Sequence, residues 1–388
     1  MRFIMLSECE TLHGATHHRR YWDMVTEAVF AEEMGFDGWG TSEHHFFNDI
    51  AVAPSPECLF TAVAMRTSRI KLRHMSRLIS VVHPVLVAEQ LATTDIFSNG
   101  RVELTTARGN TLLQLDAFGV SLDETKERSE EALDLIVRAL SNDTFSHEGK
   151  YWGSIPERSL TPRGVQHPHP PLFKICQSEA SAREAARSGL GMITSDLYLG
   201  WDTLAKMISA YRCVPDAEVT PTGGFRVNSA ASSIMTAYCA ETNAEAMRLA
   251  ERNLLRFAKM IIHDVYAQLT ERAPKDYPGY ERLIELRDYC NDAQFLRDTT
   301  ATILVGDPDY CVEQIRKHEA LGADEIILRI DGDTHQELMR NIEWFGRYVI
   351  PHFKGKDRVV SHGAVGIRPE GTDVVPTYVS SSGRLKAV

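Results

Sequence analysis

Residues 36–46 read FDGWGTSEHHF, and the fold follows from the way this stretch begins and ends. It predicts a short buried strand over 37–43, entered from a helix that stops at Gly35. The strand runs out into an acid and two imidazoles at 43–45. A polar cluster where a buried strand ends indicates chemistry at that point.

The same unit recurs along the chain, because short apolar runs alternate with longer amphipathic ones, as in a parallel sheet of βαβ units. Eight strands are expected, near residues 2–7, 37–43, 70–77, 101–107, 172–177, 190–195, 225–239 and 324–330. Eight strands close a (β/α)₈ TIM barrel, whose active sites lie at the carboxyl ends of the strands. A doubly wound open sheet is the competing fold. The barrel is preferred because no Gly-x-Gly-x-x-Gly follows any strand.

The expected helices have clear capping signals at their ends. Proline in the first turn or a capping box starts them, and glycine, asparagine or proline ends them. These signals predict helices over 55–68, 83–98, 307–322 and 334–351, and an apolar stripe of Leu133, Ile136, Val137 and Leu140 predicts one more over 123–140.

Residues 1–350 are expected to form the barrel, interrupted by two insertions at its carboxyl face. The segment 143–171 predicts a hairpin and irregular loop over the strand ends, and 262–300 predicts a polar helical insertion. Long loops beside the strand ends shape a pocket or act as a lid. The tail 351–388 has no periodicity, and either disorder or docking on a neighbouring subunit is expected.

The composition limits the classes of partner. The 388 residues carry a net charge of −11 and are 43% hydrophobic, as is typical of globular proteins with ample apolar material for a core. The negative field argues against nucleic acid or an anionic membrane, so a small-molecule substrate fits better. Seven scattered cysteines without a Cys-x-x-Cys pair predict reduced thiols in a cytoplasmic protein. Neither a signal peptide nor a membrane span is recognisable.

The imidazoles at 44 and 45 are poorly placed to chelate a metal. Neighbouring side chains of a strand point to opposite faces, so His44 and His45 cannot both face one site unless the strand has already ended. His-x-His spacing occurs only at 167–169, in a proline-rich loop, and no metal site is predicted. Two interpretations remain open. One imidazole is hydrogen-bonded in the core and the other exposed, or one is a donor or general acid/base near neutral pH.

Two other strand ends carry groups suited to an anion. Ala107-Arg108-Gly109 ends the fourth strand and places a guanidinium at the mouth, beside a glycine that lets backbone come close. Ser178 and Ser181 begin the next helix, where hydroxyls and free N–H groups form a phosphate cradle. A solvated arginine and an ordinary N-cap are the plainer alternatives. In a barrel, both groups lie on one face.

Together these segments resemble the bacterial luciferase-like flavin-dependent monooxygenases, and the resemblance covers about residues 1–350. The matching segments follow one another in the family's order and spacing. They are residues 43–46, the segment from the third strand to His83-Pro84, and residues 89–101, 107–109, 147–152, 177–181 and 305–308.

The resemblance implies a barrel that binds reduced FMN, or sometimes FAD, supplied by a separate flavin reductase. With oxygen, such an enzyme hydroxylates a small organic substrate or inserts oxygen in a Baeyer–Villiger reaction. Relatives are commonly homodimers. The apolar helices 55–68 and 83–98 are the faces where a dimer contact is expected.

The family's functional positions carry over residue by residue. His44 would be the catalytic imidazole, supported by Glu43, with His45 structural. The flavin-binding residues would be Arg108, Ser178 and Ser181 at the phosphate, Ala107 and Gln177 beside them, and Met75-Ser76 as a cis peptide beneath the ring system.

This chain departs from bacterial luciferase itself. Ala107 stands where luciferase has a reactive cysteine, Gln177 replaces a glutamate, and the two insertions differ, which argues against light emission. The aromatic residues Phe46, Phe47, Tyr151, Trp152, Tyr198 and Trp201 suggest an apolar or aromatic substrate or, equally, simple packing. A deazaflavin-dependent hydride-transfer enzyme and a non-catalytic flavin-binding subunit are the alternatives.

Overall fold

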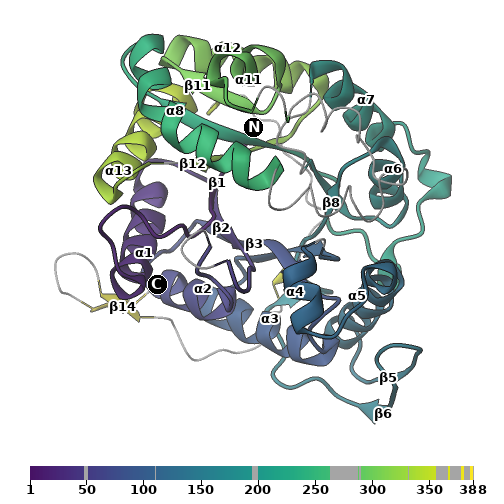
Figure 1. The fold of residues 1–388 in the computed structure, drawn as a ribbon. Coiled ribbons are helices and arrows are strands. Elements are labelled where there is room, and N and C mark those ends of the chain that lie inside the picture. The colour runs from purple at the N-terminus through teal and green to yellow at the C-terminus, as the bar shows by residue number, and fades with distance from the viewer. Residues whose placement is uncertain are drawn as a thin grey trace.

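The computed structural model describes residues 1–47, 51–109, 111–194, 200–262, 287, 290–330 and 332–354, together with three short strands near the carboxyl terminus. Parallel strands form a ring that helices surround (Figure 1). The ring consists of β1 (Arg2–Ser7), β2 (Gly38–Ser42), β3 (Lys71–Leu78), β4 (Val102–Ala107), β8 (Leu172–Cys176), β9 (Gly191–Thr194), β10 (Ala231–Cys239) and β12 (Glu325–Ile330). Strand β10 pairs with both β9 and β12, so the eight-stranded barrel is closed, as predicted.

Strand β10 differs from the expectation at both ends. It begins at Ala231 rather than near 225, because the Asn228 side chain bonds to the Leu172 carbonyl oxygen at 2.7 Å and holds the chain outside the ladder. At its carboxyl end it also pairs with a ninth strand, β11 (Ile303–Gly306), which was not predicted. Four residues directly before a helix start give too short an apolar run to recognise.

The expected helix boundaries are largely confirmed. The main helices are α1 (His17–Glu33), α2 (Pro56–Ala64), α3 (Pro84–Ser98), α5 (Thr125–Ser141), α6 (Glu179–Arg187), α7 (Trp201–Arg212), α8 (Asn243–Lys259), α12 (Pro308–Leu321) and α13 (His335–Trp344), with short α4 (Leu112–Ala117) and α11 (Ala293–Thr299). Asn99 and Gly322 end α3 and α12 with φ of 52° and 98°, the left-handed conformation that stops a helix. Regular α-helix ends at Trp344, and tighter and wider turns continue the last helix to Phe353.

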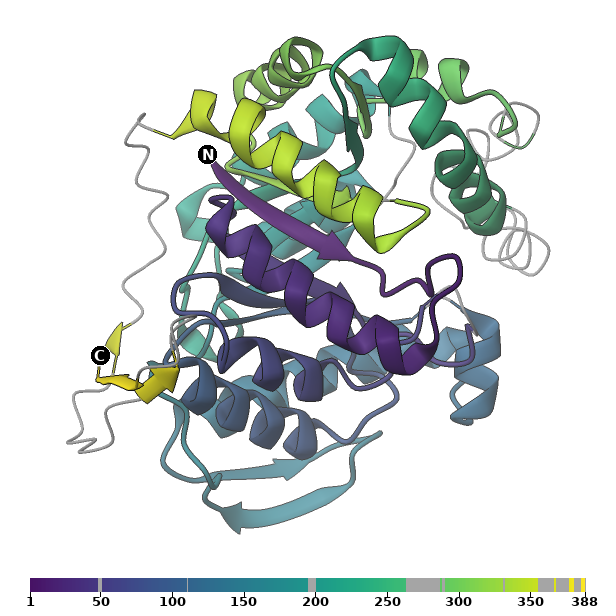
Figure 2. The same ribbon diagram turned by 90° about the vertical axis from the view of Figure 1, so that its left-hand side faces the viewer.

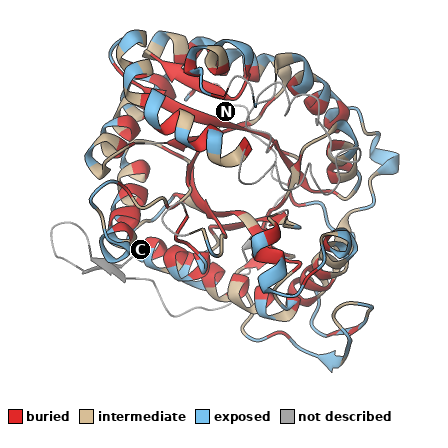
Figure 3. Cartoon of the chain, in the orientation of Figure 1, coloured by how far each residue is buried: buried red, intermediate tan, exposed pale blue. Residues whose placement is uncertain are grey.

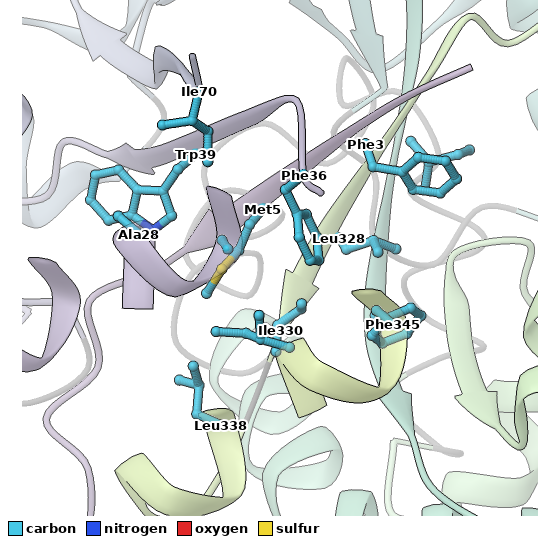
Figure 4. Close-up of a cluster of buried hydrophobic side chains, with 14 of the residues drawn as sticks. Phe3, Met5, Ala28, Phe36, Trp39, Ile70, Leu328, Ile330, Leu338 and Phe345 are labelled. Atoms are coloured by element: carbon cyan, nitrogen blue, oxygen red, sulfur yellow. The ribbon is translucent and has the colours of Figure 1, made fainter. Parts of the chain in front are cut away.

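Alternation along the strands divides the core into two shells. Side chains such as Phe3, Met5 and Leu328 face outward and pack under the helices, where Trp39 and Phe345 join them (Figure 4). Side chains one residue out of phase fill the barrel interior: Ile4, Leu6, Met75, Phe173, Ile193, Ile234 and Ile327. The barrel strands are therefore buried on both faces, and exposure lies on the outer faces of helices, in loops and in the hairpin at 145–158 (Figure 3).

The amino-terminal end of the barrel is filled by four charged side chains, called the charge layer below: Arg2, Arg73, Glu103 and Glu325. Arg73 is fully buried and contacts Glu325 at 2.8 Å and Glu103 at 2.5 Å. Arg2 bridges the same two carboxylates at 3.0 and 2.7 Å. Burial alone would raise the pKa of Glu325, but the two guanidinium groups lower it to about 2. Two cations therefore balance two anions.

The first insertion contains the predicted hairpin, formed by β5 (Phe145–Glu148) and β6 (Ser154–Arg158). The hairpin lies at the side of the molecule (Figure 2), where its tip bonds to α5 and reaches the rim of the strand ends at His83. The chain then runs to the opposite end of the barrel, where Gln166 bonds to Asp95 and to the carbonyl oxygen of Val102. Only the tip lies near the mouth, because a segment between a helix and the next strand must return to the amino end.

Most of the second insertion and of the tail lies outside the described residues. The described strand β13 (Gly366–Ile367) pairs antiparallel with β7 (Gln166–His167) of the same chain. Strands β14 (Thr377–Val379) and β15 (Leu385–Ala387) form a two-stranded sheet near the end where β1 begins (Figure 2). None of the helices in the described ranges has the length and apolar content needed to span a membrane.

Candidate active site

His44 follows the end of β2 and is held from the end of β1. Its Nε2 lies 3.3 Å from an Oε2 of Glu8, and its ring meets Phe47 edge-on at 5.1 Å. The Nδ1 atom is buried and has no hydrogen-bond partner among the described residues. Burial would raise the pKa of Glu8, but His44 and Arg329 outweigh burial and lower it. A carboxylate therefore anchors one nitrogen, while the other is left for a ligand.

Glu43 was expected to support His44, but its carboxylate binds other groups. It is buried, and its carboxylate contacts His45 Nε2 at 2.9 Å and Arg77 at 2.5 Å and accepts from the Leu78 N–H at 2.9 Å. These three partners outweigh the effect of burial and lower the pKa of Glu43. After the end of β2, Glu43 and His45 turn toward Arg77, whereas His44 turns toward Glu8. The structural role expected of His45 stays a prediction.

Two further groups extend the site beyond the sequence prediction. Arg329 of β12 is buried and donates to Glu10 at 2.5 Å, with its guanidinium 3.3 Å from the centroid of the Phe257 ring. Glu8 and Glu10 leave β1 just as Glu43 leaves β2. Glu8 and Glu10 could have been identified in the sequence, because they are acids two residues apart directly after a buried strand.

The expected cis peptide between Met75 and Ser76 is wrong. Among the described residues, cis bonds precede only Pro162 and Pro168. Instead, the pairing of β3 with both of its neighbours shifts register across Met75 and Ser76. The irregularity accommodates an extra residue without a strained peptide bond. Met75 is buried in the barrel interior, and the backbone carbonyl of Ser76 accepts from the Glu43 N–H at 3.0 Å.

Arg108 stands at the mouth immediately after Ala107, the last residue of β4. Its side chain is exposed and has no hydrogen-bond or ion-pair partner among the described residues. Its carbonyl oxygen accepts from the Ser80 hydroxyl at 2.7 Å. Gly109 follows with φ of 78°, a conformation that strains other residues.

The two serines begin α6, next to β4 in the ring, because β4 pairs with β8. They form a capping box in which Ser181 N–H donates to the Ser178 hydroxyl at 3.2 Å and Ser178 N–H donates to the Ser181 hydroxyl at 3.0 Å. The Ser181 hydroxyl also accepts from the N–H of Gln177. The ordinary cap is thus present, and adjacent strand ends bring it to the same side of the mouth as Arg108. The first N–H groups of α6 remain available to an anion.

The aromatic residues divide between the mouth and the surrounding helices. Phe46 is 56% exposed with φ of 66°, and it lies beside Phe118 at 6.2 Å. Tyr151 and Trp152 contact α5, and Trp201 packs on His318 at 5.0 Å. Tyr198 lies outside the described residues. Of the expected set, the described residues at the mouth are therefore Phe46 and Phe47.

The closed ring of parallel strands places this protein in the class of (β/α)₈ barrels. Titratable and cationic groups gather at the carboxyl ends of its strands, where this class has its active sites. A family model described as luciferase-like monooxygenase matches residues 1–325. The chain belongs to the luciferase-like monooxygenase family, as the resemblance indicated.

Individual relatives are distant but extend over most of the chain. The FMNH₂-dependent dimethylsulfone monooxygenase of Pseudomonas putida is 26% identical over 341 residues, which cover 86% of this chain and 89% of that one. The oxygenating constituent of 3,6-diketocamphane monooxygenase from Pseudomonas putida, a type II Baeyer–Villiger enzyme in complex with FMN, superposes with a TM-score of 0.68. It is 21% identical and covers 90% of this chain and 98% of its own.

A solved structure with a different cofactor shares the fold. The coenzyme F420-dependent tetrahydromethanopterin reductase of Methanopyrus kandleri superposes with a TM-score of 0.64 at 17% identity, covering 91% of this chain and 99% of that one. At such identities the structural likeness establishes the fold alone.

Proposed function

We propose that this protein is the oxygenase component of a two-component flavin-dependent monooxygenase. It would take reduced FMN from a separate flavin reductase and transfer one oxygen atom of O₂ to a small apolar organic substrate. The observation that carries the proposal is the arrangement at His44: one ring nitrogen lies against Glu8, and the other is buried with no hydrogen-bond partner in the part of the chain that the structure describes. Family membership makes flavin the cofactor to expect at this site.

The residues present fit a flavin phosphate. Arg108 has no partner among the described residues, and the start of α6 lies at the next strand end. A guanidinium and free helix N–H groups are the donors that a phosphate dianion requires. FMN, whose phosphate is terminal, suits this set, with Gln177 and Ala107 beside it. Met75 and Ser76 would lie beneath the ring system without a cis bond.

Bound reduced flavin would supply the two electrons that activate oxygen. This chain would supply the surroundings and a proton. His44 Nδ1 would exchange a proton with the reacting oxygen or with a substrate carbonyl, while Glu8 keeps the ring in one orientation. Phe46 and Phe47 would exclude water at the mouth, which prevents wasteful release of hydrogen peroxide. Hydroxylation and Baeyer–Villiger insertion both suit this arrangement.

Oxygen consumption with enzymatically reduced FMN tests the proposal. We expect candidate ketones and heterocycles to be oxygenated with reduced FMN and not with reduced deazaflavin. His44→Ala should lower turnover about 100-fold or more, since a positioned acid/base contributes about that much. Turnover with deazaflavin alone would favour the hydride-transfer alternative. Unchanged turnover in His44→Ala would instead point to a flavin-binding subunit without this chemistry.

A further inference from the structure

A chain of contacts joins the hairpin at the side of the molecule to the loop that carries Arg108. Its outer end is the hairpin tip, residues 149–152. The carboxylate of Glu131 on α5 accepts the N–H groups of Lys150, Tyr151 and Trp152, at 3.0–3.2 Å, and the His147 Nε2 at 3.0 Å. A Cβ on Gly149 would lie 2.0 Å from Glu131 Oε1, so any other residue there would displace this carboxylate from the tip. The tip is thus fixed to α5.

Arg128, one turn earlier on α5, is fixed by this tip. Its guanidinium lies 4.4 Å from the centroid of the Trp152 ring and 5.8 Å from that of Tyr151, and the indole N–H donates to the Arg128 carbonyl oxygen at 3.1 Å. From this position Arg128 Nε donates to the carbonyl oxygen of Ser80 at 2.5 Å. A cation held against two rings has little freedom to leave that bond.

Ser80 passes the constraint to the mouth. It is fully buried in the turn after β3, and its hydroxyl donates to the carbonyl oxygen of Arg108 at 2.7 Å. A Cβ on Gly109 would meet Leu115 at 3.2 Å and the Ser80 hydroxyl at 3.8 Å, so the two loops also pack against each other. The backbone of Arg108 is therefore held from the β3 loop, although its side chain is exposed.

We propose that Arg128 and Ser80 are positioning residues for the anion-binding arginine, so that the hairpin tip determines how well Arg108 receives a phosphate. This rests on the proposed function, in which Arg108 binds the flavin phosphate. Because the Arg108 side chain has no partner among the described residues, its aim depends on its backbone. A backbone already ordered before binding reduces the entropy lost when the ligand arrives. Without the chain of contacts, the arginine is still present but poorly aimed.

Binding of oxidised FMN and of riboflavin, followed by quenching of flavin fluorescence, tests this directly. The two ligands share the ring system, and only FMN carries the phosphate. Wild-type protein should prefer FMN, and Arg108→Ala should abolish the preference. Ser80→Ala and Arg128→Gln should each weaken FMN binding about three- to tenfold, the effect of one hydrogen bond, and leave riboflavin binding unchanged. The double variant should lose no more than the weaker-binding single variant, because both act through one backbone group.

Lys126→Gln is the matched control, since it removes a positive charge from the same helix. The Lys126 side chain lies 3.7 Å from Glu130, outside the chain of contacts. This variant should leave both affinities unchanged. Full FMN preference in Ser80→Ala and Arg128→Gln would overturn the positioning role and leave the phosphate site intact. Equal losses for FMN and riboflavin would also overturn it, as the sign of general destabilisation. Absence of any FMN preference in wild-type protein would overturn the phosphate site itself. Ser80→Ala removes one oxygen only, and far-UV circular dichroism checks its fold.

Discussion

The two ring nitrogens of His44 have different surroundings, and this difference assigns their roles. Nε2 lies 3.3 Å from the carboxylate of Glu8, whose pKa is lowered, so a charged acceptor faces this nitrogen at neutral pH and favours the tautomer with the proton on Nε2. Nδ1 then presents a lone pair in a buried position. Within the proposed reaction, Nδ1 is the nitrogen that accepts or returns a proton.

Replacing Glu8 should change the tautomer of His44. In Glu8→Gln the amide no longer requires a proton on Nε2, so the neutral ring should become a mixture of both tautomers. ¹⁵N chemical shifts of histidine-labelled protein measure this, with His44→Ala assigning the signal. The exposed Glu33→Gln removes the same charge elsewhere and should leave the shifts unaltered. A single Nε2–H tautomer persisting in Glu8→Gln would contradict the anchoring role.

At this scale the sequence predicts residue types better than partners. His44, Arg108 and the serine cap stand at strand ends as expected. The partner of His44 comes from the end of β1, which pairs directly with β2, and strand pairing is not recorded in any local pattern. The pairing of Glu43 with His45 forms after β2 has ended at Ser42, where strand alternation no longer fixes the directions of side chains. The shift of register across Met75 and Ser76 reflects pairing with two neighbouring strands, which no local pattern records.

Among the elements, the hairpin depends on one carboxylate. Burial would raise the pKa of Glu131, but His147 and the N–H groups of the tip outweigh it and lower the pKa. The tip is therefore tied to α5 by a charged acceptor as well as by the packing of Trp152 on the hydrophobic cluster of α5. Such contacts order a short hairpin that would be marginal alone.

Glu131→Gln should loosen the tip without affecting the barrel. A neutral amide accepts these N–H bonds less strongly, so amide hydrogen exchange at residues 150–152 should become faster. Exchange in the barrel strands and the thermal midpoint should change little. Glu148→Gln, in the same hairpin but exposed, is the control. Unchanged exchange at the tip would show that Glu131 is dispensable.

Helices were easier to predict than strands for a physical reason. Caps are local, so Asn99, Gly322 and the prolines of α2, α3 and α12 mark the helix ends in sequence and in structure. Strand limits depend on neighbours. The delayed start of β10 and the presence of β11 arise from contacts with segments tens of residues away.

For the whole molecule, the charge layer makes stability depend on acid. Glu325 has its pKa lowered to about 2, against about 4.3 in an unfolded chain. A carboxylate with a depressed pKa stabilises the fold fully above the unfolded value, and this stabilisation is lost as the pH falls through the folded value. The relevant window therefore runs from about pH 4.3 down to about pH 2.

Glu325→Gln should destabilise the protein at neutral pH by about 3–5 kcal/mol, because two buried guanidinium groups then share one carboxylate. The difference from wild type should shrink as the pH falls through that window, since the native carboxylate is itself being neutralised. Thermal unfolding of both proteins at several pH values measures this. Glu157→Gln, on the exposed hairpin, should follow wild type throughout. A difference that stays constant with pH would contradict the assignment.

The charge layer also limits the route by which ligands enter and leave the barrel. The charge layer closes the amino end of the barrel and apolar side chains fill its interior, so the site is reached from the carboxyl end. In the proposed reaction, reduced flavin, oxygen and substrate would all enter at the carboxyl end, and product and oxidised flavin would leave from the same end. Turnover would then have to be ordered, with whatever sits deepest entering first and departing last. The kinetic signature of such ordered binding is substrate inhibition, in which excess substrate blocks the exchange of flavin.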